Sequence, residues 1–313
     1  MQHCFRSDPT PDFDLILDTG SSDTWVVDSK CNSFCPTAHE VSEFDATAST
    51  TFRDLQEDFA ILYGSGYADG ILSTDVVRLG AFSTPNQTFA RVDSLSSDWS
   101  SQVVSGIMGL AFPALANSGG QPFFHSLIEQ GSLAEPVMTF SFGRAADQDQ
   151  DNSQATFGGI DGSRYTGDIT YLPVLEKKYW KVGFEGYETS TAFVPSGYGN
   201  AIIDTGTTLI TLPYDEVKKL YAKSGVLYAL QNSRLTQTCS VPEAYEVETG
   251  YWAFDCNKEL DISINFGSLT VKIDPSDLNL GKVNSTSTEC VAGITGLQSL
   301  GDLSIFGLTF LKK

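Results

Sequence analysis

Residues 15–22 read Leu-Ile-Leu-Asp-Thr-Gly-Ser-Ser, and residues 201–208 return the pattern as Ala-Ile-Ile-Asp-Thr-Gly-Thr-Thr. Each copy is a short apolar run, typical of a buried strand, followed by Asp-Thr-Gly and two hydroxyl residues. Such a run places the Asp at a strand end, and the Gly allows the backbone to turn tightly and approach another segment closely. The neighbouring hydroxyls can hydrogen-bond the carboxylate and hold its orientation.

The repeat predicts that the two loops face each other and bring Asp18 and Asp204 together. Two carboxylates at close range cannot both ionise easily, so they share a proton and offer an acid and a base at one site. The alternative is that each Asp caps an ordinary turn. A single copy would leave that alternative open, whereas two copies favour a paired site.

Length and composition bound the class of protein. A chain of 313 residues can hold two domains with sizeable cores. Its 41% apolar and 19% charged residues fit a globular chain rather than a disordered one. The formal charge of −20 argues against nucleic-acid binding, which favours a basic surface. It suits work in acid, where carboxylates are protonated, although solubility alone would explain it equally well.

Membrane and targeting signals are weak in this sequence. No stretch reaches the roughly 18 apolar residues that cross a bilayer, so we expect no membrane span. Residues 1–11 lack the apolar core of a secretory signal peptide. Sequons begin at Asn86 and Asn284, and both would accept a glycan if the protein enters the secretory route.

The two Asp-Thr-Gly loops resemble those of the pepsin-like aspartic proteases, the fungal secreted type above all, and the resemblance covers nearly the whole chain. It implies an all-β fold of two related β lobes, with a cleft between them and a few short helices. We expect an N-terminal lobe at residues 1–167, which holds the first loop and the flap hairpin. The C-terminal lobe, residues 168–313, would hold the second loop and lack the usual final strands.

Both ends depart from the family pattern. Residues 6–11 stand where the family has a strand and a Gly-Thr-Pro turn. Leu308 follows Phe306 and Gly307 where the family has Asp, and the chain stops at Lys313 before the strands that usually complete the second lobe. We therefore expect a chain truncated at both ends, and exposed sheet edges where strands are missing.

Local patterns predict further elements. Residues 59–72 form two β-runs around a Gly-rich turn, which predicts a hairpin. Residues 103–111 and 303–307 are apolar strands ending in Gly, one for each Asp loop, so each half repeats one plan. Helices are predicted within residues 122–131 and 213–225, each with Pro at its start and Gly at its stop. A strand is expected at residues 168–172.

The resemblance implies roles for particular residues. The catalytic pair would be Asp18 and Asp204. Residues expected to orient the carboxylates or tie the loops together are Thr19, Ser21, Thr205 and Thr207. Residues expected in the flap or in contact with substrate are Trp25, Tyr63, Gly64, Ser65, Tyr179 and Gly206. Trp25, and the pair Tyr179 and Trp180 that resembles a cleft-lining position, could equally be ordinary packing aromatics.

Six cysteines are too few to build the fold, so they would fasten loops. The resemblance implies disulfides Cys31–Cys35 and Cys256–Cys290. Cys4 and Cys239 could pair with each other or stay free. The close spacing of Cys31 and Cys35 could suggest a metal site, but no Cys or His cluster completes one, so we expect no metal.

These features predict an aspartic endopeptidase that hydrolyses polypeptides at acid pH and favours apolar side chains around the cut. It would need no cofactor, bind no nucleic acid, act as a monomer, and be extracellular or vacuolar. The alternative is a catalytically impaired relative that binds peptides or proteins.

Other hydrolytic mechanisms fit less well. His3, His39 and His125 lie in no motif, and Gly-x-Ser-x-Gly and His-Glu-x-x-His are absent from the sequence. Glycosidases also use two carboxylates, but in unrelated contexts rather than in a repeated loop.

Overall fold

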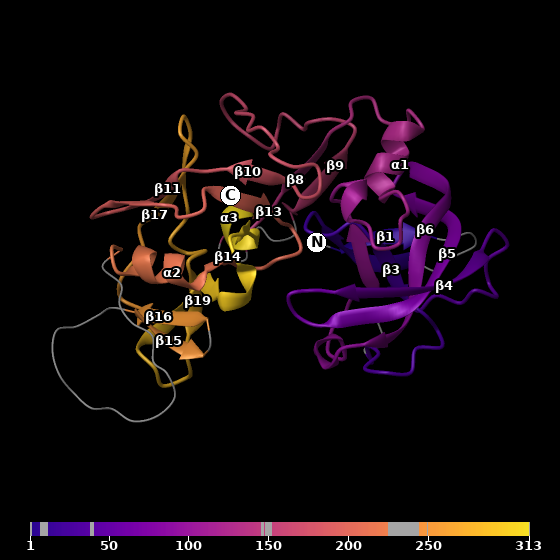
Figure 1. Cartoon of the computed structure of the whole chain (residues 1–313), viewed down its shortest axis with the longest axis horizontal. Helices are drawn as coiled ribbons and strands as arrows, with labels where there is room; N and C mark the ends of the chain where they lie inside the picture. The colour runs from indigo at the N-terminus through magenta and orange to yellow at the C-terminus, as the bar shows by residue number, and fades with distance from the viewer. Residues whose placement is uncertain are drawn as a thin grey trace. The chain divides into compact units, whose positions relative to one another are not determined.

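The computed structural model describes residues 2–6, 12–37, 41–144, 147, 152–224, 244–248 and 250–312, with backbone alone at 2–6 and 244–248 (Figure 1). The described residues are mostly β-strand, with three short α-helices: α1 (Phe123–Glu129), α2 (Tyr214–Tyr221) and α3 (Leu308–Leu311). The predicted all-β class is therefore confirmed. None of these helices is both long and apolar enough to cross a membrane.

The chain forms two compact units that interleave along the sequence. The first comprises Met1–Phe140, Gln154–Ser163 and Lys177–Trp180. The second comprises Ser141–Ser153, Arg164–Glu176 and Lys181–Lys313. The lobe boundary predicted between residues 167 and 168 stays a prediction, because each unit draws on more than one segment of the chain.

The first unit is built on one seven-stranded sheet with the strand order β1-β2-β7-β3-β6-β5-β4, in which β1 also pairs with β5. Its strands are β1 (Gln2–Arg6), β2 (Asp12–Asp18), β3 (Thr24–Val27), β4 (Arg53–Leu62), β5 (Tyr67–Leu79), β6 (Phe82–Leu95) and β7 (Gly106–Gly109). In β2, Phe13, Leu15 and Leu17 are buried while the residues between them are half-buried, as expected of alternating side chains in a strand. A two-stranded sheet pairs β8 (Met138–Ser141) with β9 (Gln154–Phe157).

The second unit contains three sheets. The central one has the order β10-β13-β22-β14-β21, and the others have the orders β12-β11-β17-β18 and β15-β16-β20-β19. The strands of the central sheet are β10 (Lys181–Gly183), β13 (Asn200–Ile203), β14 (Ile210–Pro213), β21 (Ile294–Leu297) and β22 (Ser304–Phe306). The remaining strands are β11 (Gly186–Thr189), β12 (Phe193–Pro195), β15 (Ala244–Glu248), β16 (Tyr251–Asp255), β17 (Ile262–Asn265), β18 (Thr270–Lys272), β19 (Asn279–Lys282) and β20 (Glu289–Ala292).

The predicted repeat of one plan is confirmed by strand pairing. In the first unit β2 runs parallel to β7, with Asp18 opposite Gly109, and β7 pairs antiparallel with β3. In the second unit β13 runs parallel to β22, which pairs antiparallel with β14. Each Asp loop thus joins two strands that flank the same short, Gly-ended strand.

Of the predicted local elements, the hairpin and both helices are confirmed and one strand is wrong. The hairpin is confirmed as β4 and β5, which pair from Leu62 opposite Tyr67 outward. Both helices are confirmed as α1 and α2, each with Pro at its N-cap; Gly225 lies outside the described residues. The strand expected at residues 168–172 is wrong: no strand is assigned there, and Ile169 and Tyr171 are exposed. An apolar, β-prone run becomes a strand only where a neighbouring strand completes its hydrogen bonds.

One glycine beside each Asp loop allows the loop to lie very close to its neighbouring strand. A Cβ on Gly109 would lie 2.4 Å from the carbonyl carbon of Ser22, and a Cβ on Gly307 would lie 2.3 Å from the carbonyl oxygen of Thr207. Both contacts are with backbone, which cannot swing away as a long side chain can. Only glycine fits at either position without moving the loop.

We expect Gly109→Ala and Gly307→Ala each to lower the free energy of unfolding by about 1 to 3 kcal/mol, the usual cost of overpacking. Denaturant unfolding of the full chain measures this. Gly162→Ala is the matched control, because a Cβ there meets no atom within 4 Å. Equal stability of all three variants would contradict the close-approach argument.

Candidate functional site

The first Asp loop holds its carboxylate through local hydrogen bonds. Asp18 ends β2 and is 5% exposed. Its Oδ1 accepts a hydrogen bond from the backbone N–H of Gly20 at 2.8 Å, and its Oδ2 accepts one from the Ser21 hydroxyl at 2.5 Å. The Asp18 carbonyl in turn accepts the N–H of Leu110 at 2.7 Å. The carboxylate is therefore fixed by its own loop, and the loop by the strand beside it.

The second loop repeats this arrangement nearly atom for atom. Asp204 directly follows β13 and is 7% exposed. Its Oδ1 accepts from the N–H of Gly206 at 2.8 Å, and its Oδ2 from the Thr207 hydroxyl at 2.6 Å. The N–H of Asp204 donates to the carbonyl of Phe306 at 3.1 Å, which ties this loop to β22. Two similar sequences thus give two similar carboxylate sites.

Thr19 and Thr205, which stand between the Asp and the Gly of each loop, are also buried, at 5% and 9% exposure. The first loop belongs to the first unit and the second loop to the second unit. The Ser21 hydroxyl bonds the Asp18 carboxylate, and the Thr207 hydroxyl bonds the Asp204 carboxylate. The meeting of the two aspartates stays a prediction, as does the tie between the two threonines.

The hairpin formed by β4 and β5 ends in a turn that depends on glycine. The N–H of Tyr63 donates to the carbonyl of Gly66 at 2.9 Å, which closes the turn between β4 and β5. Gly66 has φ = 90°, in the left-handed region that glycine favours, and a Cβ there would lie 2.0 Å from the Ser96 hydroxyl. Gly64 and Ser65 at the tip are exposed. The tip is thus anchored at one side and open at the other.

Tyr63 and Trp25 are joined across the first unit. The Trp25 indole N–H donates to the Tyr63 hydroxyl oxygen at 2.7 Å, and Trp25 is fully buried with Trp99 edge-on at 4.9 Å. Burial raises the pKa of Tyr63, the nearby carboxylates of Asp18 and Asp23 raise it further, and hydrogen bonds to Trp25 and Ser21 oppose the rise. The phenol therefore stays protonated from acid to neutral pH, close to Asp18.

Two aromatic residues support the first loop: Trp180, from the Tyr179 and Trp180 pair expected at the cleft, and Phe112, which the sequence did not single out. The Trp180 indole N–H donates to the carbonyl of Leu110 at 3.0 Å, and its ring lies 4.5 Å from the ring of Phe112. The Ser22 hydroxyl donates to the carbonyl of Phe112 at 2.7 Å. The predicted contact residue Tyr179, next to Trp180, is half-buried. The second hydroxyl residue after Asp-Thr-Gly was the signal in the sequence for this contact. Ser21 bonds the carboxylate of Asp18, whereas Ser22 bonds the carbonyl of Phe112.

Asp23 is a second buried carboxylate that the sequence did not mark. Its two oxygens accept the backbone N–H groups of Asn117 and Ser118 at 2.8 and 3.0 Å, and it is 2% exposed. Asp23 therefore fixes a loop that is far away in the sequence and lies just after Phe112. The position that matches it in the second copy is Leu209.

Among the described residues there are two disulfides, Cys31–Cys35 and Cys256–Cys290, with Cα atoms 5.9 and 5.1 Å apart. The side chain of Cys4 and all of Cys239 lie outside the described residues. Within the described residues, no group of three or more His, Cys, Asp or Glu side chains could hold a metal ion.

His125, in α1, is the histidine whose side chain the structure describes. Burial lowers its pKa, while nearby Glu129 opposes the shift, and its ring packs near Phe112 and Phe124. Its Nδ1 is buried and has no hydrogen-bond partner among the described residues. The side chains of His3 and His39 lie outside the described residues.

Comparisons with known proteins give a consistent result. The family model described as "Eukaryotic aspartyl protease" matches residues 8–313. "Major aspartyl peptidase 1" of Cryptococcus neoformans is 34% identical, in a match that covers 97% of this chain and 63% of that protein. "Aspartic protease" of Phaffia rhodozyma is 36% identical over 91% of this chain and 65% of its own length. "Vacuolar aspartic protease" of Candida albicans is 33% identical, with 97% and 69% covered. The chain thus spans less than two thirds of the first two relatives.

The hydrogen bond from Trp25 to Tyr63 should order the flap turn. We expect Trp25→Phe to speed amide hydrogen exchange at Tyr63 and Tyr67 by about fivefold to tenfold, as the loss of one hydrogen bond would. Trp99→Phe is the matched control, because it removes similar volume from the same aromatic cluster and keeps the Trp25 donor. Equal exchange in the two variants would contradict this role.

Proposed function

The chain belongs to the eukaryotic aspartyl protease family, and from this premise we propose that it is an aspartic endopeptidase that hydrolyses peptide bonds in polypeptides. The observation that carries the proposal is the pair of matched loops. Asp18 and Asp204 are each held by the N–H of the following Gly and by a hydroxyl three residues on. A turn-capping Asp needs no such duplicate in a second, similarly paired set of strands.

In the proposed mechanism the two carboxyl groups share one proton and hold a water molecule. The ionised carboxylate takes a proton from the water, whose oxygen attacks the peptide carbonyl carbon, while the protonated partner donates to the carbonyl oxygen. The resulting tetrahedral diol then passes a proton to the amide nitrogen, and the C–N bond breaks. Either aspartate can begin as the base, because their local hydrogen bonds are alike.

The loops supply orientation for this chemistry. The Ser21 and Thr207 hydroxyls donate to the Oδ2 atoms, so each carboxylate keeps one orientation while protons move. Thr19 and Thr205 would tie the loops together, and the backbone of Gly206 would contact the substrate. Each of these groups acts on geometry, which sets how often the water and the carbonyl align.

The hairpin would act as the lid over an extended substrate. Tyr63 contributes a neutral phenol beside Asp18, and Trp25 keeps its ring in place. Gly64 and Ser65 at the exposed tip offer backbone groups that a polypeptide can bind, and a closed lid would exclude water from the reaction. Tyr179 would line the cleft, and apolar substrate side chains would be favoured around the cut.

The protein would act at acid pH, where one proton on the carboxyl pair is retained, and in the vacuole or outside the cell. Relatives whose names include "Vacuolar" support the location. On that route the exposed sequon residues Asn86 and Asn284 become accessible to glycosylation. We propose a monomer that needs neither cofactor nor metal and binds no nucleic acid, in keeping with the charge of −20.

We expect Asp204→Asn to lower the rate of protein cleavage by roughly three orders of magnitude or more, as loss of one member of a concerted catalytic unit does. Digestion of a denatured globular protein from about pH 2 to 7, with and without a statine-type transition-state mimic, measures this. The unfolding free energy should stay within about 1 kcal/mol of the parent, since the amide keeps the shape of the carboxyl group.

Asp215→Asn is the matched control, because Asp215 is exposed in the first turn of α2 in the same unit. The Asp215→Asn variant should cleave the denatured protein at the parental rate. Mimic-sensitive cleavage that survives Asp204→Asn would refute the assignment, and a parent chain that cleaves nothing across this pH range would refute the proposed activity.

A further inference from the structure

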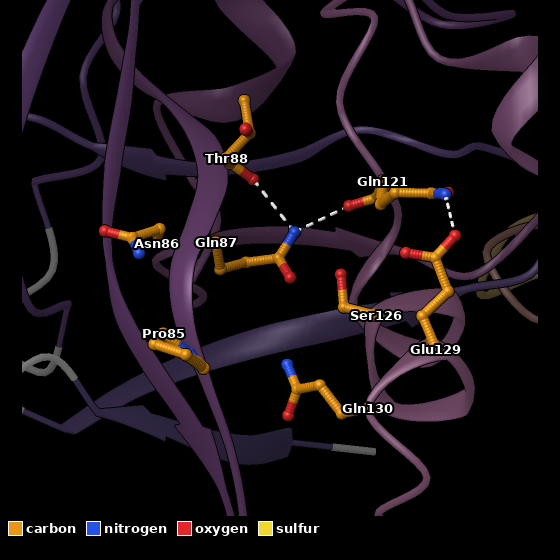
Figure 2. Close-up of a pocket in the computed structure, with 8 residues that line it drawn as sticks. All are labelled: Pro85, Asn86, Gln87, Thr88, Gln121, Ser126, Glu129 and Gln130. Atoms are coloured by element: carbon orange, nitrogen blue, oxygen red, sulfur yellow. Dashed lines mark hydrogen bonds between the residues drawn. The ribbon is translucent and has the colours of Figure 1, made fainter.

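A pocket of about 350 Å³ opens in the first unit between β6 and α1 (Figure 2). Its lining residues are Pro85, Asn86, Gln87, Thr88, Gln121, Ser126, Glu129 and Gln130. All but Pro85 carry a side chain that hydrogen-bonds, and Glu129 is the one charged residue among them. This lining suits a neutral, hydroxyl-rich molecule better than an apolar or strongly charged one.

Side-chain amides build one wall of the pocket. Gln87 is 4% exposed, and its Nε2 donates to the carbonyls of Gln121 at 2.6 Å and Thr88 at 3.2 Å. Figure 2 shows Gln87 reaching from β6 toward Gln121, whose own Nε2 donates to Glu129 at 2.5 Å. These bonds fasten β6 to the start and the end of α1, so the pocket has a fixed frame.

One acceptor in this frame is left over. The Oε1 atom of Gln121 is buried and has no hydrogen-bond partner in the described part of the chain. This atom is closed off from solvent, so a ligand in the pocket bonds the accessible polar groups of the lining instead. Ser126 and Gln130, on the opposite wall, add a hydroxyl and an amide that can bond the same ligand.

The pocket also carries a sequon on its rim. Asn86, Gln87 and Thr88 form one of the two Asn-x-Thr sequences, and Asn86 is exposed. Asn86 has φ = 53° where the β5–β6 register shifts, so the chain bulges at this residue. In Figure 2 its side chain lies at the outer side of β6, at the edge of the pocket rather than inside it. A group attached there can fold back over the bulge.

We propose that Asn86 carries an N-linked glycan whose first sugars lie in this pocket. In the attachment step Nδ2 of Asn86 forms a C–N bond to the anomeric carbon of a lipid-diphosphate-linked oligosaccharide. The anomeric C–O bond breaks, the lipid diphosphate leaves with the electron pair, and the amide proton passes to a base of the transferring enzyme. The seated sugars bond Ser126 and Gln130, and their C–H face packs on Pro85.

Asn284 provides the internal comparison. It is exposed in the turn between β19 and β20, where its Oδ1 accepts the N–H and the hydroxyl of Thr286 at 3.1 and 2.9 Å. It does not line the pocket beside β6. A glycan on Asn284 should therefore extend into solvent, whereas the glycan on Asn86 should be protected. The inference uses the proposed secretory location and not the proposed protease activity.

The test uses the full chain directed into the secretory route of a yeast, with Asn86→Gln and Asn284→Gln each leaving one sequon. Glycopeptide mass analysis should find a glycan at Asn86. On the native protein, endoglycosidase H should release the Asn86 glycan about tenfold more slowly than the Asn284 glycan, as a few bonds to the pocket would require. After denaturation the two should be released at equal rates.

A pocket variant separates seating from mere crowding. Ser126→Ala combined with Gln130→Ala keeps the sequon and removes two of the bonding groups, so native release from Asn86 should rise to the rate at Asn284. Release from Asn284 in the same variant should not change, which also reports that the fold is kept. The proposal is overturned if Asn86 is unmodified, if its glycan is released as fast as that of Asn284, or if the pocket variant leaves a slow release unchanged.

Discussion

The close approach of each Asp loop to the backbone of a short neighbouring strand is the constraint on which the rest of the structure depends. Gly109 and Gly307 allow this contact, since a Cβ at either position would overlap main-chain atoms of the loop. A backbone hydrogen bond from each glycine strengthens this contact. Gly109 donates to the carbonyl of Asp23, and Gly307 to that of Leu209, both at 3.1 Å. A carboxylate that needs a fixed orientation is thus placed on the least yielding part of the fold, the centre of a sheet.

The two units build different surroundings on this shared frame. In the first, a buried Trp25 follows the loop and reaches Tyr63 of the hairpin, and Asp23 fixes residues 117 and 118. In the second, the matching positions are Thr211 and Leu209, both buried, and α2 follows β14 directly. The repeat therefore conserves what holds a carboxylate and varies what lies around it.

The parts of the fold that sequence reasoning predicted were those that local chemistry determines. The Asp-Thr-Gly loops, the Gly-rich hairpin, both Pro-started helices and the Gly-ended strands each depend on a few neighbouring residues. The residues that were missed depend on contacts distant in the chain. The carbonyl of Phe112 accepts from the Ser22 hydroxyl ninety positions away, and Asp23 accepts N–H groups more than ninety positions away. The wrong strand at 168–172 has the same cause, since its apolar residues describe a propensity and only a partner strand would complete it.

The buried and exposed carboxylates of this chain differ in the partners that hold them. Its buried carboxylates rely largely on neutral donors: Glu216 is 3% exposed and accepts from the Tyr187 hydroxyl at 2.9 Å and from the N–H of Gly197. Some carboxylates do depend on ionisation. Hydrogen bonds from Ser276, and then the Arg144 guanidinium, lower the pKa of Asp274. A lowered pKa means that the stability from Asp274 is complete above its ordinary pKa and is lost only as pH falls through the lowered value. The excess negative charge of the chain is neutralised at higher pH, as pH falls toward the pI near 4.3, and below that pH the chain becomes net positive, so relaxed self-repulsion does not offset this loss. The donors that hold the two Asp loops are backbone N–H and hydroxyl groups, which keep their protons in acid.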